Sequence, residues 1–189
     1  MRVLGISGSL RRDSYNSGLL RAAAELLQPG AQLEVYDGLK AIPPYDADDD
    51  VQPAPAPVEA LREAIADADA VLIATPEYNA SIPGVLKNAL DWASRPHATN
   101  PLRGKPAAVV GASTGMFGAV WAQAETRKVL STIGARVVDM ELPVPEGDER
   151  FDAGGRLRDD EVAEQYGEVL DALVEAAEVR AAGLAARAA

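Results

Sequence analysis

Residues 8–17 read Gly8-Ser9-Leu10-Arg11-Arg12-Asp13-Ser14-Tyr15-Asn16-Ser17, and only Ser7 separates them from the apolar run 3–6. This order predicts a strand, a loop rich in hydroxyl groups, and a helix that begins near Ser17. A helix start offers unpaired N–H groups and the positive end of the helix dipole, and both attract phosphate. Arg11 adds a charged, two-pronged contact. A single serine is enough to cap a helix, so we interpret the whole run as a phosphate-binding loop.

Outward from this loop, apolar segments of strand length alternate with amphipathic segments of helix length. The expected strands are 2–7, 32–37, 70–75, 106–113 and 135–140, and the expected helices are 17–28, 58–68, 83–94, 117–133 and 159–181. This alternation predicts an α/β fold with a parallel sheet and helices on both faces. We expect a single domain over residues 1–181, a frayed tail over 182–189, and irregular segments at 40–57 and 143–157.

Two further loops follow predicted strands and carry unusual residues. The first spans residues 75–84 and mixes Tyr78, Asn79, hydroxyl groups and two prolines that stiffen the backbone. The second spans residues 111–118 and is rich in glycine, so it can approach a flat ligand closely. The carboxyl ends of neighbouring parallel strands meet at one edge of a sheet, where ligands bind in such folds. The three loops together predict a site for a ligand with one phosphate and a planar ring.

Composition excludes several classes of protein. The net charge of −11 argues against a nucleic-acid-binding protein, whose surface would be basic. The absence of cysteine excludes disulfides, thiolate metal sites and cysteine nucleophiles. The chain starts directly with a predicted strand, without a secretion signal, and no apolar run approaches the roughly 20 residues of a membrane span. We therefore expect a cytoplasmic protein without a membrane span.

Other catalytic motifs are weak or incomplete. Residues 111–115 match G-x-S-x-G between a strand and a helix, but the single histidine, His97, precedes Ser113, against the order of the α/β-hydrolases. No G-x-G-x-x-G follows the first strand, and no P-loop sequence is present. His97 lacks partner histidines, so we interpret it as a solvated surface residue and expect no metal site.

Single residues leave more than one interpretation open. Glu77 is either a catalytic acid or, as we favour, a structural carboxylate, and Tyr78 either lines the ring site or packs its own loop. Lys87 is expected to pair with a carboxylate or to line a subunit contact. Trp92 and Trp121 are expected in the core, with a subunit interface as the second interpretation. The aspartates at 48–50 indicate a solvated face.

Three segments closely resemble one family. They are residues 8–16, residues 76–92, which read Pro-Glu-Tyr-Asn-Ala-Ser-Ile-Pro-Gly-Val-Leu-Lys-Asn-Ala-Leu-Asp-Trp, and residues 104–115 with Gly104-Lys105-Pro106 and Ser113-Thr114-Gly115. In this order they resemble the NADPH-dependent FMN reductase family, which includes bacterial quinone, azo-dye and chromate reductases. The resemblance extends from residue 2 to about residue 175.

The resemblance implies a flavodoxin-like, doubly wound, five-stranded parallel sheet of order 2-1-3-4-5 that binds FMN. It assigns the phosphate to Ser9, Arg11, Ser14 and Asn16, with Ser17 assisting. It assigns the isoalloxazine ring to Pro76, Glu77, Tyr78 and Asn79, and the other side of the flavin to Ser113, Thr114 and Gly115. It also implies a homodimer or homotetramer with the flavin near the subunit interface.

The function that this resemblance implies is an NAD(P)H oxidoreductase. Hydride passes from NADPH or NADH to the flavin, and then to a quinone, a free flavin or a similar small acceptor such as an azo dye or chromate. No catalytic side chain is required, because the cofactor carries the chemistry. Arg103 and Lys105 are the candidates for a contact to the 2′-phosphate of NADPH. Two alternatives remain: an electron-carrier flavodoxin-like protein, and a protein of the same fold that binds no flavin.

Overall fold

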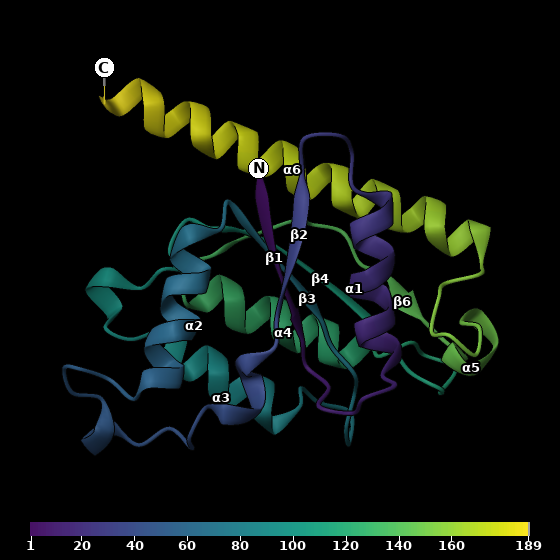
Figure 1. Ribbon diagram of the computed structural model, residues 1–189, viewed down its shortest axis with the longest axis horizontal. Coiled ribbons are helices and arrows are strands. Elements are labelled where there is room, and N and C mark those ends of the chain that lie inside the picture. The colour runs from purple at the N-terminus through teal and green to yellow at the C-terminus, as the bar shows by residue number, and fades with distance from the viewer. Residues whose placement is uncertain (189) are drawn as a thin grey trace.

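The computed structural model describes residues 1–188 and contains one central parallel sheet (Figure 1). The strand order is β2-β1-β3-β4-β5, with the short β6 also paired to β4, so the predicted order 2-1-3-4-5 is confirmed. The strands are β1 (Arg2–Ser7), β2 (Gln32–Tyr36), β3 (Ala70–Ala74), β4 (Pro106–Ala112), β5 (Arg136–Val137) and β6 (Pro143–Val144). The helices are α1 (Tyr15–Leu26), α2 (Ala56–Asp67), α3 (Gly84–Ala93), α4 (Val120–Thr132), α5 (Gly147–Arg150) and α6 (Asp160–Ala188).

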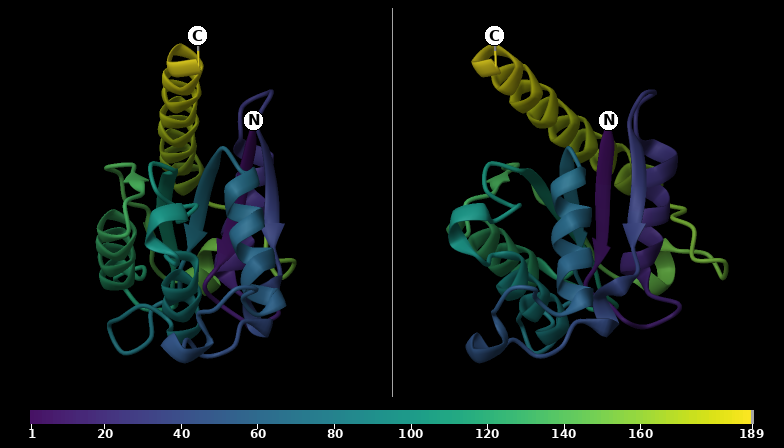
Figure 2. Two further views of the ribbon diagram at one scale, coloured as in Figure 1. Left: turned by 90° about the vertical axis from the view of Figure 1, so that its left-hand side faces the viewer. Right: turned by 60° about the vertical axis from the view of Figure 1, so that its left-hand side comes forward.

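The two faces of the sheet are covered by different helices. Alternate residues of β3 face opposite ways: Leu72 packs with α1 and α6, whereas Val71 and Ile73 pack with α2, α3 and α4. All five residues of β3 are buried, as expected for a central parallel strand. The three layers are visible in Figure 2. The core therefore consists of two apolar clusters, one on each side of the sheet.

The last helix is longer than the sequence pattern predicts. α6 does not end at residue 181 but continues to Ala188, so the predicted end of this helix is wrong, and residue 189 lies outside the described part. Fraying of the end of this helix stays a prediction. Figures 1 and 2 show the end of α6 projecting beyond the sheet at the edge that carries the N-terminus. The buried Tyr166 anchors the other half of α6, because its hydroxyl donates to the Leu19 carbonyl at 3.1 Å.

The edge strand predicted at 135–140 is interrupted. β5 holds only Arg136 and Val137, and the chain pairs with β4 again at β6, where Pro143 lies opposite Gly111. Side chains of α4 hold the intervening segment: Arg127 donates to the carbonyls of Val138, at 3.0 Å, and Met140. The predicted strand is wrong beyond residue 137, since these side-chain contacts replace part of the strand pairing.

The segments predicted to be irregular contain short ordered elements. Residues 143–157 include β6, α5 and an isolated antiparallel bridge between Phe151 and Leu157. Residues 38–49 include the 3₁₀ helices η1 (Gly38–Ala41) and η2 (Ala47–Asp49). Helix α3 anchors this second segment, because the Pro43 carbonyl accepts hydrogen bonds from Asn88 and from the buried Trp92. The core position predicted for Trp92 is confirmed.

Lys105 lies just before β4 at the amino edge of the sheet, opposite the ends of the strands where the three loops begin. It is only 2 % exposed, and its Nζ donates to the carbonyls of Ala66, at 3.1 Å, and Ala68. These carbonyls lie at the C-terminus of α2, which a cation stabilises. The suggestion that Lys105 contacts a 2′-phosphate is therefore wrong, because the amine is already bound inside the protein.

We predict that Lys105 makes stability depend on pH. Burial, and then the nearby Arg180 guanidinium, lower the pKa of the Lys105 amine from 10.5 to about 8. Between these values the unfolded chain binds a proton that the folded chain has released, so the free energy of unfolding rises with pH in this window. A neutral amine still has enough N–H donors for both carbonyls.

Urea unfolding of the wild type and of Lys105→Met between pH 8 and 10.5 measures this effect. We expect the difference in free energy of unfolding between the two proteins to grow by on the order of 2 kcal/mol in favour of the wild type. The same pH dependence in both proteins would contradict the prediction.

Candidate functional site

Three loops meet in one cleft at the carboxyl ends of β1, β3 and β4. The cleft has a volume of about 340 Å³, within the usual range for small-molecule sites. Nine of the twelve predicted site residues line it, namely Ser9, Arg11, Ser14, Asn16, Pro76, Glu77, Tyr78, Ser113 and Thr114. Ser17, Asn79 and Gly115 do not line the cleft. Tyr15 and Ala112 line it and were missed by the sequence analysis.

The first loop presents backbone and hydroxyl groups at the start of α1. Ser14 is the N-cap, and its Oγ accepts a hydrogen bond from the Asn16 N–H at 3.2 Å. The Ser9 Oγ accepts from the Arg11 N–H at 3.3 Å, which curls the loop. Among residues 1–188, no acceptor receives the N–H groups of Arg12 and Asp13. The loop therefore offers unpaired donors together with the positive end of a helix.

Arg11 supplies the positive charge of the cleft. It is exposed, and its guanidinium lies 5.2 Å from the ring centroid of Tyr15. The Tyr15 ring in turn packs against Phe151, with their centroids 5.4 Å apart. The signal in the sequence that could have identified Tyr15 is an aromatic residue four positions after Arg11. An aromatic ring near an arginine can restrain its long cationic side chain.

Asn16 and Ser17 have internal partners. The buried Asn16 side chain donates to the Ala112 carbonyl and accepts from the Ala112 N–H, each at 3.0 Å. The Ser17 Oγ donates to the Ser7 Oγ at 3.3 Å. Both residues join the first loop to neighbouring strands, and the direct contact of Asn16 with a ligand remains a prediction.

The second loop turns back on itself in a tight hairpin. Tyr78 and Ser81 form an antiparallel bridge, in which each N–H donates to the carbonyl of the other residue. Asn79 and Ala80 between them have φ values of 55° and 56°, typical of a type I′ turn. Asparagine tolerates this conformation, whereas alanine is strained there. The turn leaves Tyr78 exposed at the rim of the cleft.

Two carboxylates fasten this loop to α4. The Glu77 Oε2 accepts from the N–H groups of Trp121 and Ala122, at 3.0 and 3.1 Å, and so caps a helix whose N-cap residue, Ala119, has no capping side chain. Glu125 accepts from the Ser81 hydroxyl and the Ile82 N–H, and these hydrogen bonds hold the pKa of its carboxyl below the ordinary value. The structural interpretation of Glu77 is therefore supported.

The third loop closes the cleft with small residues. Its Gly118 has a φ of 55°, and a Cβ there would lie 2.5 Å from the Val144 nitrogen, so only glycine fits between the loop and β6. The Ser113 Oγ donates to the Gly115 carbonyl at 3.3 Å.

His97 lies in η3 (His97–Thr99), which precedes the amino end of β4. The structure thus provides no histidine base for a hydrolytic serine at residue 113.

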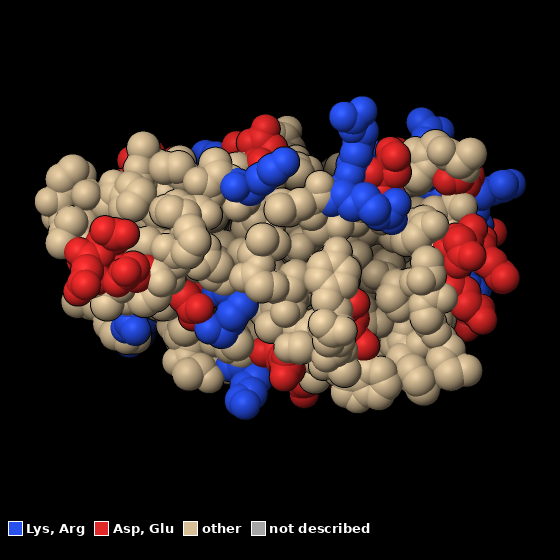
Figure 3. Space-filling view, turned by 90° about the horizontal axis from the view of Figure 1, so that it is seen from below, with Lys and Arg blue, Asp and Glu red and all other residues tan. Residues whose placement is uncertain are grey.

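Exposed apolar side chains lie on the three loops that form the cleft and on the adjoining helices. Figure 3 shows this face, where charged side chains of both signs are scattered around a broad uncharged area. The exposed residues from the three loops and the adjoining helices are Leu10, Tyr78, Val85, Met116, Phe117 and Trp121. The core position expected for Trp121 is wrong, because the residue is 46 % exposed and its ring packs edge-on against Phe117. Lys87 pairs with Asp91 on α3, as expected.

Comparisons with known proteins agree with this geometry. The sequence model of the family described as NADPH-dependent FMN reductase matches residues 1–149. An NAD(P)H-dependent FMN reductase of Pseudomonas aeruginosa is 47 % identical over 92 % of this chain and 93 % of its own length. A 2-hydroxy-1,4-benzoquinone reductase of Burkholderia sp. is 40 % identical over 83 % of this chain and 85 % of its own length. The solved flavoenzyme NAD(P)H:(acceptor) oxidoreductase of Paracoccus denitrificans superposes with a TM-score of 0.82 at 37 % identity, covering 94 % of this chain and 97 % of the other.

We predict that Glu77 acts through its hydrogen bonds to α4 and not as a proton donor. Glu77→Ala removes the acceptor of two helix N–H groups and is expected to lower the free energy of unfolding by about 1–2 kcal/mol. Glu77→Gln keeps a carbonyl acceptor, so it should lose much less stability and keep its turnover rate. Denaturant unfolding and steady-state rates of both variants test this, and a large rate loss in Glu77→Gln with unchanged stability would indicate acid catalysis instead.

Proposed function

This chain belongs to the NADPH-dependent FMN reductase family, and we propose on that basis that its cleft binds FMN through the nine lining residues predicted from the sequence. The protein is an FMN-dependent NAD(P)H oxidoreductase. The observation that carries the proposal is the convergence of three separate loops, each predicted for a different part of FMN, on a single cleft.

The phosphate end of the proposed site is the first loop. The unpaired N–H groups of Arg12 and Asp13, the start of α1 and the exposed Arg11 guanidinium supply donors and positive charge. Ser9 and Ser14 add hydroxyl donors on the same wall. Asn16 and Ser17 complete this end of the proposed site, and their side chains also hold the loop in place, since they are bound to Ala112 and Ser7.

The ring end of the proposed site lies between the second and third loops. Among residues 1–188, no acceptor receives the N–H groups of Glu77 and Asn79, so these groups are available to the polar edge of a flat ring. Pro76 and Tyr78 on one side and Ser113 and Thr114 on the other line the slot. We extend the ring site to Asn79 and Gly115, which adjoin these lining residues in the chain.

Bound FMN supplies the hydride-accepting and hydride-donating chemistry of the reaction. The chain itself orients the ring by the loops that Glu77 and Glu125 hold against α4. N–H groups directed at a ring edge stabilise negative charge that develops there. Because the rim of the cleft is open and apolar, a nicotinamide donor and then an acceptor can use the same face in turn.

A quinone or a free flavin is the proposed acceptor. Relatives named for quinones support this class, including the quinone reductase of Escherichia coli, which is 38 % identical. Azo dyes and chromate are further acceptors to be tested. The electron-carrier alternative is less well supported, because the similar proteins that cover most of this chain are named as reductases.

The exposed apolar rim also supports the proposed homodimer or homotetramer, with the copies meeting beside the cleft. We further propose residues 1–181 as a single FMN-binding domain and a cytoplasmic location. Within residues 1–188, every helix is too short or too polar to cross a membrane.

Anaerobic mixing of the FMN-loaded protein with NADPH, and separately with NADH, tests the function directly. We expect the flavin absorbance to bleach rapidly with at least one donor and to return when a benzoquinone is added. A protein that binds FMN but stays oxidised with both donors would be an electron carrier and would overturn the proposal.

We predict that Arg11→Ala weakens FMN binding. Removal of a charge-assisted contact to the phosphate is expected to cost about 2 kcal/mol, or roughly thirtyfold in the dissociation constant. Fluorescence titration of the apoprotein measures this constant. Arg12→Ala is the matched control, because it removes an exposed side chain that does not line the cleft and keeps the backbone N–H group. Equal FMN affinity of Arg11→Ala and the wild type would refute the assignment of the phosphate loop.

A further inference from the structure

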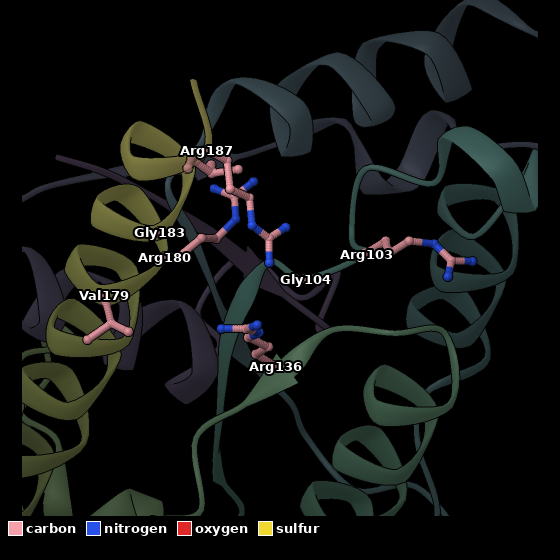
Figure 4. A pocket seen from close by; sticks show the side chains of 8 residues that line it. Arg103, Gly104, Arg136, Val179, Arg180, Gly183 and Arg187 are labelled. Carbon is pink, nitrogen blue, oxygen red and sulfur yellow. The ribbon is translucent and has the colours of Figure 1, made fainter. Parts of the chain in front are cut away.

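A second pocket lies at the amino edge of the sheet, away from the cleft. It has a volume of about 220 Å³ and is lined by Arg103, Gly104, Arg136, Val179, Arg180, Gly183, Leu184 and Arg187. These residues come from the loop before β4, from β5 and from the projecting end of α6 (Figure 4). Four arginines at one pocket stand out in a chain whose net charge is −11.

Three of the four guanidinium groups gather, and no Asp or Glu of residues 1–188 lines the pocket. Arg180 and Arg187 lie seven residues apart, on one face of α6, and extend over Gly104, while Arg136 reaches toward them from β5 (Figure 4). The Arg103 side chain points away and donates to the His97 carbonyl at 3.1 Å. Within residues 1–188, none of the four arginines forms an ion pair.

The arginines are not needed to bind the carbonyls at the C-terminus of α2, because Lys105 already binds them. The C-terminus of α2, which presents partial negative charge at this edge, is bound by the Lys105 amine. Arg180 lies close enough to lower the pKa of that amine, while Asp67 and Asp69 act in the opposite direction. Arg180 therefore adds a second positive charge at this edge, although the Ala66 and Ala68 carbonyls already have the Lys105 amine as donor.

The walls of the pocket leave room for a ligand. Gly104 has a φ of 69°, and a Cβ at Gly104 or at Gly183 would meet no atom within 4 Å. Guanidinium groups bind phosphate and carboxylate oxygens in pairs, and several forks that surround one small space favour a ligand with more than one negative charge.

We propose that this pocket binds a small multivalent anion of the diphosphate or tricarboxylate class, at a site separate from the cleft. The anion offsets the repulsion among Arg136, Arg180 and Arg187 and holds the projecting end of α6 against β5. The proposal does not depend on FMN binding, because the two sites lie at opposite edges of the sheet.

Isothermal titration calorimetry of the full chain with pyrophosphate, and separately with citrate, tests the proposal at constant ionic strength. We expect saturable binding of at least one anion, weakened roughly tenfold or more in the double variant Arg136→Gln/Arg180→Gln, since charge-assisted contacts are lost. Lys40→Gln is the matched control, because Lys40 is exposed in η1 and lines neither pocket.

Arg11→Gln separates this pocket from the cleft. Binding of the anion should keep its wild-type affinity in Arg11→Gln and be weakened roughly tenfold or more in Arg136→Gln/Arg180→Gln, with both variants folded by circular dichroism. Loss of binding in Arg11→Gln instead would assign the anion to the cleft and overturn the proposal. Absence of saturable binding to the wild type, or dissociation of an oligomer in the double variant without anion binding to the wild type, would overturn it as well.

Discussion

The carboxyl edge of the sheet depends on two hydrogen bonds between the Asn16 side chain and the backbone of Ala112, each 3.0 Å long. Both groups are buried, and leaving either unpaired would cost about 1–3 kcal/mol. The pair joins the first turn of α1 to the last residue of β4, so the first and third loops keep one spacing. If the first and third loops could separate, the cleft between them would have no fixed width for a flat ring. The Asn16 side-chain amide therefore sets the width of the cleft.

The second loop is fixed by a different device. Glu77 binds the N-terminus of α4, and Glu125 of α4 binds Ser81 and Ile82 of the loop, so hydrogen bonds join the loop to the helix at two points. The strained conformation of Ala80 persists because the Tyr78–Ser81 bridge on both sides of it determines the turn. Groups that are held before a ligand arrives lose less entropy when it binds, which is the physical benefit of this rigid loop.

Local patterns in the sequence predicted the strands of a parallel sheet and the three loops, whereas the sheet order and nine of the residues that line the cleft were implied by the resemblance to the family. What they could not predict depends on distant partners. The role of Asn16 requires Ala112, 96 residues away. The break between β5 and β6 depends on Arg127 of α4, whose side chain binds the carbonyls of Val138 and Met140. The extension of α6 was open to prediction, because its last residues are mostly alanine, the strongest helix former.

The two edges of the sheet attract anions by different means, and the direction of the helices explains the difference. Parallel strands with returning helices place helix N-termini at the carboxyl edge, so backbone N–H groups and one arginine are enough for a phosphate there. The amino edge receives helix C-termini, which repel anions, and Lys105 neutralises one of them. An anion site at that edge therefore requires full positive charges from side chains. Arg136, Arg180 and Arg187 supply them on elements that meet only because α6 extends past the sheet.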